Sequence, residues 1–241
     1  VKRNVVITGA NRGIGLGLVK ELLKEEKVGR IFATTRNAAK SVELQEISDD
    51  RVIIVEMDAE SDESIEKAVQ MIGKTVGSSG VDILVNNAGV LNHVSVSEKI
   101  NRKKALDNFN VNCVCSMAVT QCFHDLLKAG AKKHKHSQIV NVSSLLGSIA
   151  LSTGSMEANV TPYSMSKAGL NLFTKNISID WKGDGIRATS VHPGWVKTDL
   201  GGDMAPLTVE QSTSSMARTI LKLGEAHNGL FFDWNGKAMD W

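Results

Sequence analysis

Short runs of β-branched and other apolar residues alternate with longer amphipathic stretches along the whole sequence. This alternation predicts βαβ units, in which consecutive strands lie parallel and helices connect them. The runs are nearly all apolar and rich in Val and Ile, as expected of strands that helices cover on both faces. The predicted strands are residues 4–8, 31–35, 52–56, 83–86, 139–142, 188–191 and 230–232.

The stretches between these strands predict the helices. The predicted helices are residues 14–26, 61–76, 103–128, 164–182 and 209–223, with a weaker candidate at 38–47. No Pro/Ser-rich linker or change of composition interrupts the series, so the pattern favours one domain over residues 1–241. The expected fold is α/β, a doubly wound parallel sheet of about seven strands with helices on both faces.

Composition excludes several other classes of protein. Charged residues make up 22% and hydrophobic residues 42%, which excludes disorder and a disulfide scaffold. The net charge of +2 gives no reason to expect a nucleic acid or an acidic membrane as partner. No apolar run is long enough to span a membrane, so the default expectation is cytoplasmic, although a trimmed leader stays open because the sequence does not begin with Met.

Two local clusters are expected to carry no chemistry. Cys113, Cys115 and Cys122 lie within ten residues, a spacing that suits neither a disulfide framework nor a zinc site, so they are expected to be reduced core thiols. The basic run 132–136 lies between a predicted helix and a predicted strand, and a solvated loop is the expectation there. No metal site is expected.

The first predicted strand runs directly into Thr8-Gly9-Ala10-Asn11-Arg12-Gly13-Ile14-Gly15 and then into a helix. Open α/β folds hold a dinucleotide pyrophosphate at this place. Glycine lets the backbone approach the phosphates while the N-terminus of the helix faces the anion. The spacing here is G-x-x-x-G-x-G rather than G-x-G-x-x-G, and an ordinary glycine turn is the alternative interpretation.

The end of the second predicted strand favours one form of the dinucleotide. NAD sites usually place an acidic residue about twenty positions after the last glycine, but Thr34-Thr35-Arg36 stands here. Arg36 can bind a 2′-phosphate with its guanidinium, and Arg12 in the glycine loop can approach the same group. The sequence therefore predicts NADP(H) rather than NAD(H). The alternative is that both arginines are ordinary surface residues.

Tyr163 and Lys167 are four positions apart and so share one face of a predicted helix. Tyr163 is the only tyrosine in the sequence. Acid–base work near neutrality requires the pKa of a phenol to fall by about 3, and a neighbouring ammonium would lower it. A hydroxyl from Ser143 or Ser144, at the end of the fifth predicted strand, would hydrogen-bond a substrate carbonyl. The pattern Y-x-x-x-K taken alone also arises by chance.

Together and in this order, these motifs resemble the classical short-chain dehydrogenase/reductase family over nearly the whole chain. The resemblance also includes Asp58, Asn86-Asn87-Ala88-Gly89, Asn112 and Pro193-Gly194. Residues 191–202 and 231–241 resemble more narrowly the sniffer-type carbonyl reductases. The resemblance implies a Rossmann-type fold and NADP(H)-dependent reduction of a ketone, aldehyde or quinone.

The resemblance implies a role for each catalytic position. Ser144 would polarise the substrate carbonyl, Tyr163 would pass the proton, and Lys167 would lower the pKa of the tyrosine and bind the nicotinamide ribose. Asn112 would hold a relay water. Ser144 is preferred to its neighbour because the serine of the family stands three positions before a glycine, here Gly147.

The resemblance also implies the binding residues. Asp58 would contact the adenine, Thr198 would hold the carboxamide, and Trp195 would lie near the substrate with Ser144 and Tyr163. The structural alternatives are that Asn86 ties strands together, that Asp58 caps the next helix and that Trp195 packs in the core. The full expected coenzyme set is Gly9, Asn11, Arg12, Gly13, Ile14, Gly15, Arg36, Asp58, Ala59, Asn87, Ala88, Gly89, Tyr163, Lys167, Pro193, Gly194, Val196 and Thr198.

One departure from the family and two rival functions stay open. From Ser144 to Tyr163 the chain runs 19 positions, longer than usual in the family, with residues 151–161 as the apparent excess. This segment would shape the pocket or alter the helix surfaces through which relatives associate, which leaves a homodimer as an open expectation. The rival functions are a more specialised steroid or pteridine reductase and a dinucleotide-binding regulatory protein without turnover.

Overall fold

The computed structural model describes residues 2–154 and 159–241. One sheet runs through it in the order β3-β2-β1-β4-β5-β6-β7-β8, and every neighbouring pair is parallel except β7 and β8. Strand order reverses on the two sides of β1, as in a doubly wound Rossmann-type fold. The strands are β1 Arg3–Ile7, β2 Val28–Thr35, β3 Val52–Glu56, β4 Ile83–Asn86, β5 Ser137–Val142, β6 Ile186–His192, β7 Phe231–Asp233 and β8 Ala238–Met239.

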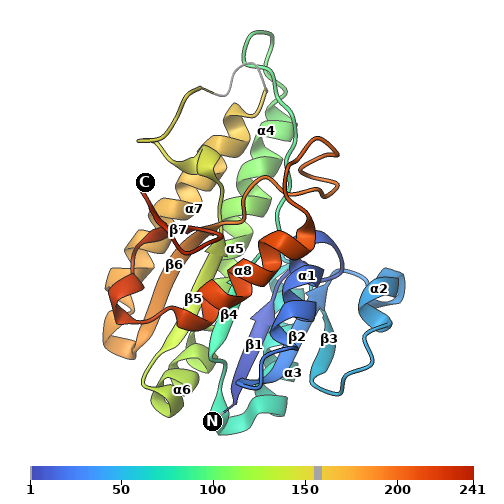
Figure 1. The fold of residues 1–241 in the computed structure, drawn as a ribbon, viewed down its shortest axis with the longest axis vertical. Coiled ribbons are helices and arrows are strands. Elements are labelled where there is room, and N and C mark those ends of the chain that lie inside the picture. Colours follow the sequence, from blue (N-terminus) through green and yellow to red (C-terminus); the bar gives the residue numbers. More distant parts are fainter. Residues whose placement is uncertain (1, 155–158) are drawn as a thin grey trace.

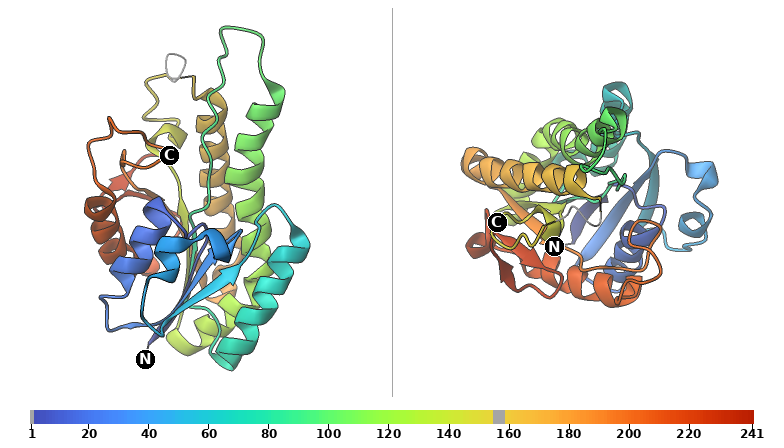
Figure 2. Two further views of the ribbon diagram at one scale, coloured as in Figure 1. Left: turned by 90° about the vertical axis from the view of Figure 1, so that its right-hand side faces the viewer. Right: turned by 90° about the horizontal axis from the view of Figure 1, so that it is seen from above.

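Helices cover both faces of this sheet (Figures 1 and 2). Successive residues of β1 point to opposite sides, so Val5 and Ile7 pack with α1 and α8 while Val6 packs with α3, α5, α6 and α7. The expected two-sided α/β architecture is therefore confirmed. The helices are α1 Gly13–Leu22, α2 Val42–Gln45, α3 Asp62–Val76, α4 Arg102–Phe109, α5 Cys115–Cys122, α6 His124–His134, α7 Thr161–Asp180 and α8 Val209–Lys222.

The predicted helix 103–128 is wrong in its continuity and its end. The chain forms α4, then a π-helical turn at Asn110–Val114, then α5, and after Phe123 it continues as α6 to His134. The first part of the basic run 132–136 is thus the last turn of α6 rather than a solvated loop. Basic side chains are favourable in that turn because the C-terminal end of a helix carries partial negative charge. His134 is mostly buried, with Nε2 3.2 Å from Oδ1 of Asp82.

Two short elements also differ from the prediction. The predicted helix 38–47 is a 3₁₀ turn, Ala38–Lys40, followed by the single turn of α2. The strand β8 was not predicted, because two residues carry no readable alternation. Of the segment 151–161, residues 155–158 lie outside the described residues.

Three further observations bear on function. The cysteines are free thiols, of which Cys115 is buried and the other two are partly buried. Within residues 2–154 and 159–241, no helix combines the length and apolar character needed to cross a bilayer. The same residues contain no group of three His, Cys, Asp or Glu side chains that could hold a metal ion.

Candidate active site

The glycine loop forms the turn from β1 to α1. Gly9 and Gly13 adopt positive φ angles of 62° and 53°, which favour glycine. Gly15 is required by close packing instead, since a Cβ there would collide with the carbonyl oxygen of Gly9 and lie 2.6 Å from Nδ2 of Asn87. Side chains at these positions would break the turn, so the loop is more specific than an ordinary glycine turn.

The start of α1 is chemically suited to an anion. Arg12 precedes the helix, its side chain makes no capping hydrogen bond, and the first turn contains no acidic residue. The first N–H groups of a helix carry partial positive charge and lack partners inside the helix. The residues present therefore fit the pyrophosphate of a dinucleotide.

The turn after β4 is fastened to the glycine loop. The Asn87 amide group Nδ2 donates to the carbonyl oxygens of Thr8 and Gly9 at 2.8 and 3.1 Å. In return, Oγ1 of Thr8 accepts from the backbone N–H groups of Asn87 and Ala88 at 2.9 and 3.0 Å. Asn86 points elsewhere and donates to Oδ1 of Asn141 on β5, which confirms its strand-tying alternative.

The segment after β6 covers the glycine loop from another side. A Cβ on Gly13 would lie 3.3 Å from Cγ2 of Thr198, and Nη1 of Arg12 lies 2.6 Å from Oδ2 of Asp199. This segment begins at Pro193, whose carbonyl oxygen accepts from Oγ of Ser212 on α8 at 2.6 Å. The structure thus brings three loops from distant parts of the chain around one place at the carboxyl edge of the sheet.

The two arginines lie at the rim of this place and remain accessible. The side chains of Arg12 and Arg36 are 67% and 71% exposed, and Nη1 of Arg36 is 4.0 Å from Oε1 of Glu60. Asp58 follows β3 nearby, and its carboxylate accepts from the backbone N–H of Glu60. The alternative that Asp58 caps α3 is wrong, because the side chain of Ser61 occupies that cap.

The first half of α7 carries Tyr163 and Lys167, and both side chains are almost fully buried. Nζ of Lys167 lies 5.8 Å from the centroid of the Tyr163 ring and donates to the carbonyl oxygen of Val142 at 2.8 Å. The side chain of Ser144 is hydrogen-bonded to Tyr163. Ser143 instead turns its hydroxyl toward the carbonyl oxygen of Lys167, so Ser144 is the serine at the phenol.

Burial shifts the proton affinities of this pair. Burial raises the pKa of Tyr163 to about 12, against the lowering effect of the Ser144 hydrogen bond. Burial also lowers the pKa of Lys167 to about 8. The direction for Tyr163 is opposite to the one expected from the sequence. Desolvation disfavours the charged form of each group, and the ammonium is held at the Val142 carbonyl rather than at the phenol oxygen.

Asn112 lies in the π-helical turn between α4 and α5 and is fully buried. Its side chain donates to the carbonyl oxygen of Val90 and to Oγ of Ser166, and it accepts from the N–H of Val90. A Cβ on Gly89 would lie 3.1 Å from Oδ1 of Asn112 and 3.6 Å from Nζ of Lys167. Asn112 therefore joins the loop after β4 to α7 beside the ammonium. Such π-helical turns are frequent at functional sites.

The loops after β5 and β6 expose apolar side chains. Trp195 is 56% exposed and donates from Nε1 to the carbonyl oxygen of Gly201, so the core-packing alternative for it is wrong. Six further residues of these two loops expose apolar side chains. These side chains are Leu145, Leu146, Ile149, Leu151, Leu200 and Met204.

Sequence reasoning missed some contributors to the site. Ser166 donates from Oγ to the carbonyl oxygen of Tyr163 and accepts from Asn112, but a serine within a helix carries no distinctive signal. The carbonyl of Val142 that receives the Lys167 ammonium is backbone, and no sequence pattern marks it. Thr8 could have been found, because it immediately precedes the first glycine of the loop.

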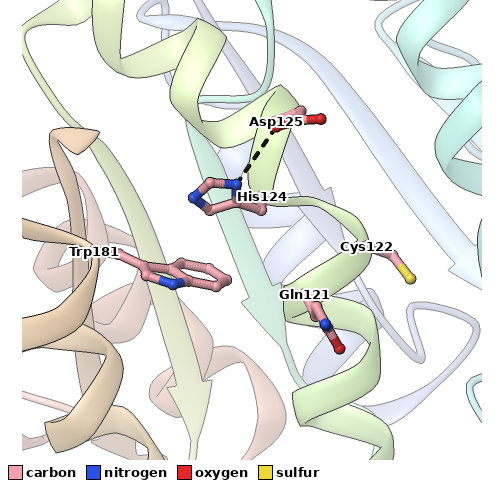
Figure 3. A pocket seen from close by; sticks show the side chains of 5 residues that line it. All are labelled: Gln121, Cys122, His124, Asp125 and Trp181. Atoms are coloured by element: carbon pink, nitrogen blue, oxygen red, sulfur yellow. Dashed lines mark ion pairs between the residues drawn. The ribbon is translucent and has the colours of Figure 1, made fainter. Parts of the chain in front are cut away.

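A separate hollow of about 310 Å³ lies where α5 meets α6 (Figure 3). The ring of His124 packs edge-on against Trp181 with centroids 4.5 Å apart, and Nδ1 is 3.5 Å from Oδ1 of Asp125. Trp181 directly follows the last residue of α7 and lies 18 positions after Tyr163, which is roughly 27 Å along a helix that rises about 1.5 Å per residue. The hollow is therefore distant from the candidate active site.

A doubly wound sheet with a glycine loop after its first strand and a Ser, Tyr and Lys group at its carboxyl edge defines a nucleotide-dependent oxidoreductase. The chain belongs to the short chain dehydrogenase family, whose model matches residues 3–206.

Individual proteins resemble the chain over its whole length. It is 34% identical to an uncharacterised oxidoreductase of Schizosaccharomyces pombe, covering 97% of this chain and 96% of that one. The solved carbonyl reductase Sniffer of D. melanogaster is 35% identical with a TM-score of 0.94, covering 100% of both chains. The NADPH-bound carbonyl reductase from chicken fatty liver is 32% identical with a TM-score of 0.93, covering 100% of this chain and 99% of that one. These likenesses confirm the family predicted from the motifs.

Proposed function

We propose that this chain is an NADP(H)-dependent carbonyl reductase that converts a ketone, aldehyde or quinone to the alcohol. The observation that carries the proposal is the burial of Tyr163 and Lys167 on one face of α7, with Nζ of Lys167 5.8 Å from the centroid of the phenol ring and the buried Ser144 acting on the phenol. The similar proteins from D. melanogaster and chicken are carbonyl reductases, and the chicken structure contains NADPH. These similarities support the same reaction class here.

The three loops around the start of α1 would hold the coenzyme. The uncapped N-terminus of α1 suits its pyrophosphate, and the exposed guanidinium groups of Arg12 and Arg36 suit a 2′-phosphate. Asp58 is proposed at the adenine and Thr198 at the carboxamide. When bound, the coenzyme supplies the hydride, and the protein residues supply orientation and the proton.

Tyr163 is proposed as the proton donor. Because burial raises its pKa to about 12, the phenol keeps its proton at neutral pH until an oxygen of greater basicity develops on the substrate. The hydrogen bond from Ser144 and the ammonium of Lys167 then stabilise the phenolate that forms. Ser144 would also orient the substrate oxygen. In this scheme Asn112 positions Lys167 and a relay water.

The substrate side of the site is proposed to favour apolar carbonyl compounds. Trp195 and the exposed apolar side chains of the loops after β5 and β6 offer little polar chemistry apart from Ser144 and Tyr163. Apolar pocket walls with a few placed polar groups are typical of small-molecule sites. A regulatory role without turnover is disfavoured, since binding alone does not require a buried Tyr and Lys pair.

We also propose a homodimer formed through α4, α5 and α7. Helices α4 and α7 lie side by side (Figure 2). Their outer surfaces, with α5 and the π-helical turn, expose Leu106, Val114, Met117, Met165, Leu172 and Ile179. Light scattering should give twice the chain mass, and Leu172→Glu should give the single mass.

The cytoplasm stays the proposed location, supported by the three free thiols.

The experiment that tests the proposed reaction follows NADPH oxidation by the purified chain with a reactive dicarbonyl compound. Formation of the hydroxy product in equal amount to the NADPH consumed is the expected result. NADPH binding without turnover across ketones, aldehydes and quinones would favour the regulatory protein instead. Turnover confined to steroids or pterins in such a panel would identify a more specialised reductase.

A further inference from the structure

Ser144 is held by a short turn immediately after β5. Its Oγ accepts from the backbone N–H of Leu146 at 3.2 Å, and its carbonyl oxygen accepts from the N–H of Gly147 at 2.9 Å. These bonds close the 3₁₀ turn Leu145–Gly147. The orientation of the Ser144 hydroxyl therefore depends on where this turn is held.

One side of the turn rests on α7. A Cβ on Gly147 would lie 2.8 Å from Cβ of Lys167, and the carbonyl oxygen of Gly147 accepts from Nδ2 of Asn171 at 3.2 Å. This contact brings the turn against the helix that carries the phenol and the ammonium. It fixes the turn from one direction only.

The other side is bound by residues nearly a hundred positions later in the chain. Oγ of Ser148 donates to the carbonyl oxygen of Asp240 at 2.7 Å, and the N–H of Ala150 donates to the carbonyl oxygen of Trp241 at 2.8 Å. Ser148 is 2% exposed and also accepts from the N–H of Leu151. In both views of Figure 2, the end marked C lies beside this turn.

The segment 238–241 is itself firmly anchored. Its strand β8 pairs with β7 through Phe231 and Met239. The ring of Trp241 stacks on Phe231 with centroids 5.6 Å apart and planes at 15°, and Phe231 is buried. The segment therefore connects the turn after β5 to the edge of the sheet.

We propose that residues 238–241 position Ser144 for the reaction, with Trp241 and Ser148 as the positioning residues. The outer side of the turn needs this support, because Leu145 and Leu146 are partly exposed and Ile149 is largely exposed, so that none of the three is buried in the core. The inference rests on the proposed function for its effect on turnover, but its effect on the hydrogen bond of Tyr163 does not depend on turnover.

The test compares Trp241→Ala, Trp241→Phe and Ser148→Ala with Lys237→Ala. Lys237→Ala changes an exposed side chain in the same part of the chain. The hydrogen bond from Lys237 to Oδ1 of Asp233 is made by its backbone N–H, which this substitution keeps. Ser148→Ala removes the hydrogen bond to the carbonyl oxygen of Asp240, and Trp241→Ala removes the ring that stacks on Phe231 and anchors the segment. Loss of one interaction of about this strength predicts a roughly threefold to tenfold fall in kcat for each variant. NADPH affinity should stay within about twofold, because neither residue contacts the glycine loop. Trp241→Phe retains a ring for Phe231 and should restore most of the rate.

A second readout follows the hydrogen bond directly, without substrate or coenzyme. Tyr163 is the only tyrosine, so the NMR signal of its Cζ atom is a single resonance. Weakening the Ser144 bond should move this signal at neutral pH and raise the pKa of the phenol, because that bond lowers it. Trp241→Ala and Ser148→Ala should both show this change, and Trp241→Phe should not.

Two results would overturn the positioning role. One is a Tyr163 signal and a kcat in both variants equal to those of Lys237→Ala. The other is loss of NADPH binding together with kcat, which would indicate general disruption of the fold. If the unmodified chain shows no turnover at all, the proposed function fails, and the Tyr163 signal still decides whether the segment positions Ser144.

Discussion

Nζ of Lys167 lies 5.8 Å from the centroid of the Tyr163 ring, while its hydrogen bond goes to the carbonyl oxygen of Val142. Both side chains are buried. In the proposed reaction the ammonium would therefore act on the phenolate through its field rather than through a direct bond to the oxygen. Its effect depends on whether Lys167 carries its proton.

Carbonyl reduction is predicted to slow as the pH rises through about 8. Burial lowers the pKa of Lys167 to about 8, so above that pH the residue becomes neutral and no longer stabilises the phenolate of Tyr163. The pH profile of kcat/KM with a carbonyl that does not titrate in this range measures the effect. Lys167→Arg stays charged and should lose the alkaline decline while keeping a reduced rate. An ordinary exposed lysine stays charged up to about pH 10. A wild-type rate that does not change between pH 7 and about pH 10 would therefore refute the role of Lys167.

Arg36→Ala is predicted to erode the preference for NADPH over NADH. Loss of a hydrogen bond to a charged group costs about 1.5–3 kcal/mol, which is roughly a tenfold to hundredfold rise in the Kd of NADPH. The Kd of NADH should change little, because it has no 2′-phosphate. Titrating both coenzymes against each variant measures the ratio. Arg30→Ala is the matched control, because Arg30 is an exposed arginine on strand β2, which Arg36 directly follows. A ratio unchanged by Arg36→Ala would count against the assignment.

Gly15→Ala is predicted to weaken both folding and coenzyme binding. The added Cβ would collide with the carbonyl oxygen of Gly9 and lie 2.6 Å from Nδ2 of Asn87, so the glycine loop must shift. Such overpacking costs about 1–3 kcal/mol in the free energy of unfolding. Gly183→Ala provides the control, since nothing lies within 4 Å of a Cβ there. Denaturant unfolding and NADPH titration of the two variants should differ clearly, and equal values would show that Gly15 is not close-packed.

Much of the fold could be predicted because strands buried on both faces require continuous apolar runs. The runs at 52–56 and 83–86 coincide with β3 and β4. The continuous helix 103–128 was wrong because amphipathic periodicity does not register one extra residue in a turn, as in Asn110–Val114. The glycine loop could be located because its residue types are required by sterics.

The candidate site could be predicted only where the types and spacing of side chains form a motif. Tyr163 and Lys167 do so by their spacing on one helix, whereas Ser144 was preferred to Ser143 only through the family resemblance, in which the serine stands three positions before a glycine. The direction of the Tyr163 pKa could not be predicted, because it depends on burial that loops distant in sequence provide. The hydrogen bonds that join Asp240 and Trp241 to the turn after β5 are made by backbone carbonyls, which every residue has.

The central claim, that Tyr163 delivers the proton, is tested most directly by Tyr163→Phe. The measurement is the rate of NADPH oxidation with a reactive dicarbonyl compound at saturating coenzyme and neutral pH, alongside the Kd of NADPH. Removing a general acid costs about a hundredfold to ten-thousandfold in rate, and that fall is predicted here with the Kd of NADPH changed less than about twofold. Equal rates in the wild type and Tyr163→Phe would contradict the account.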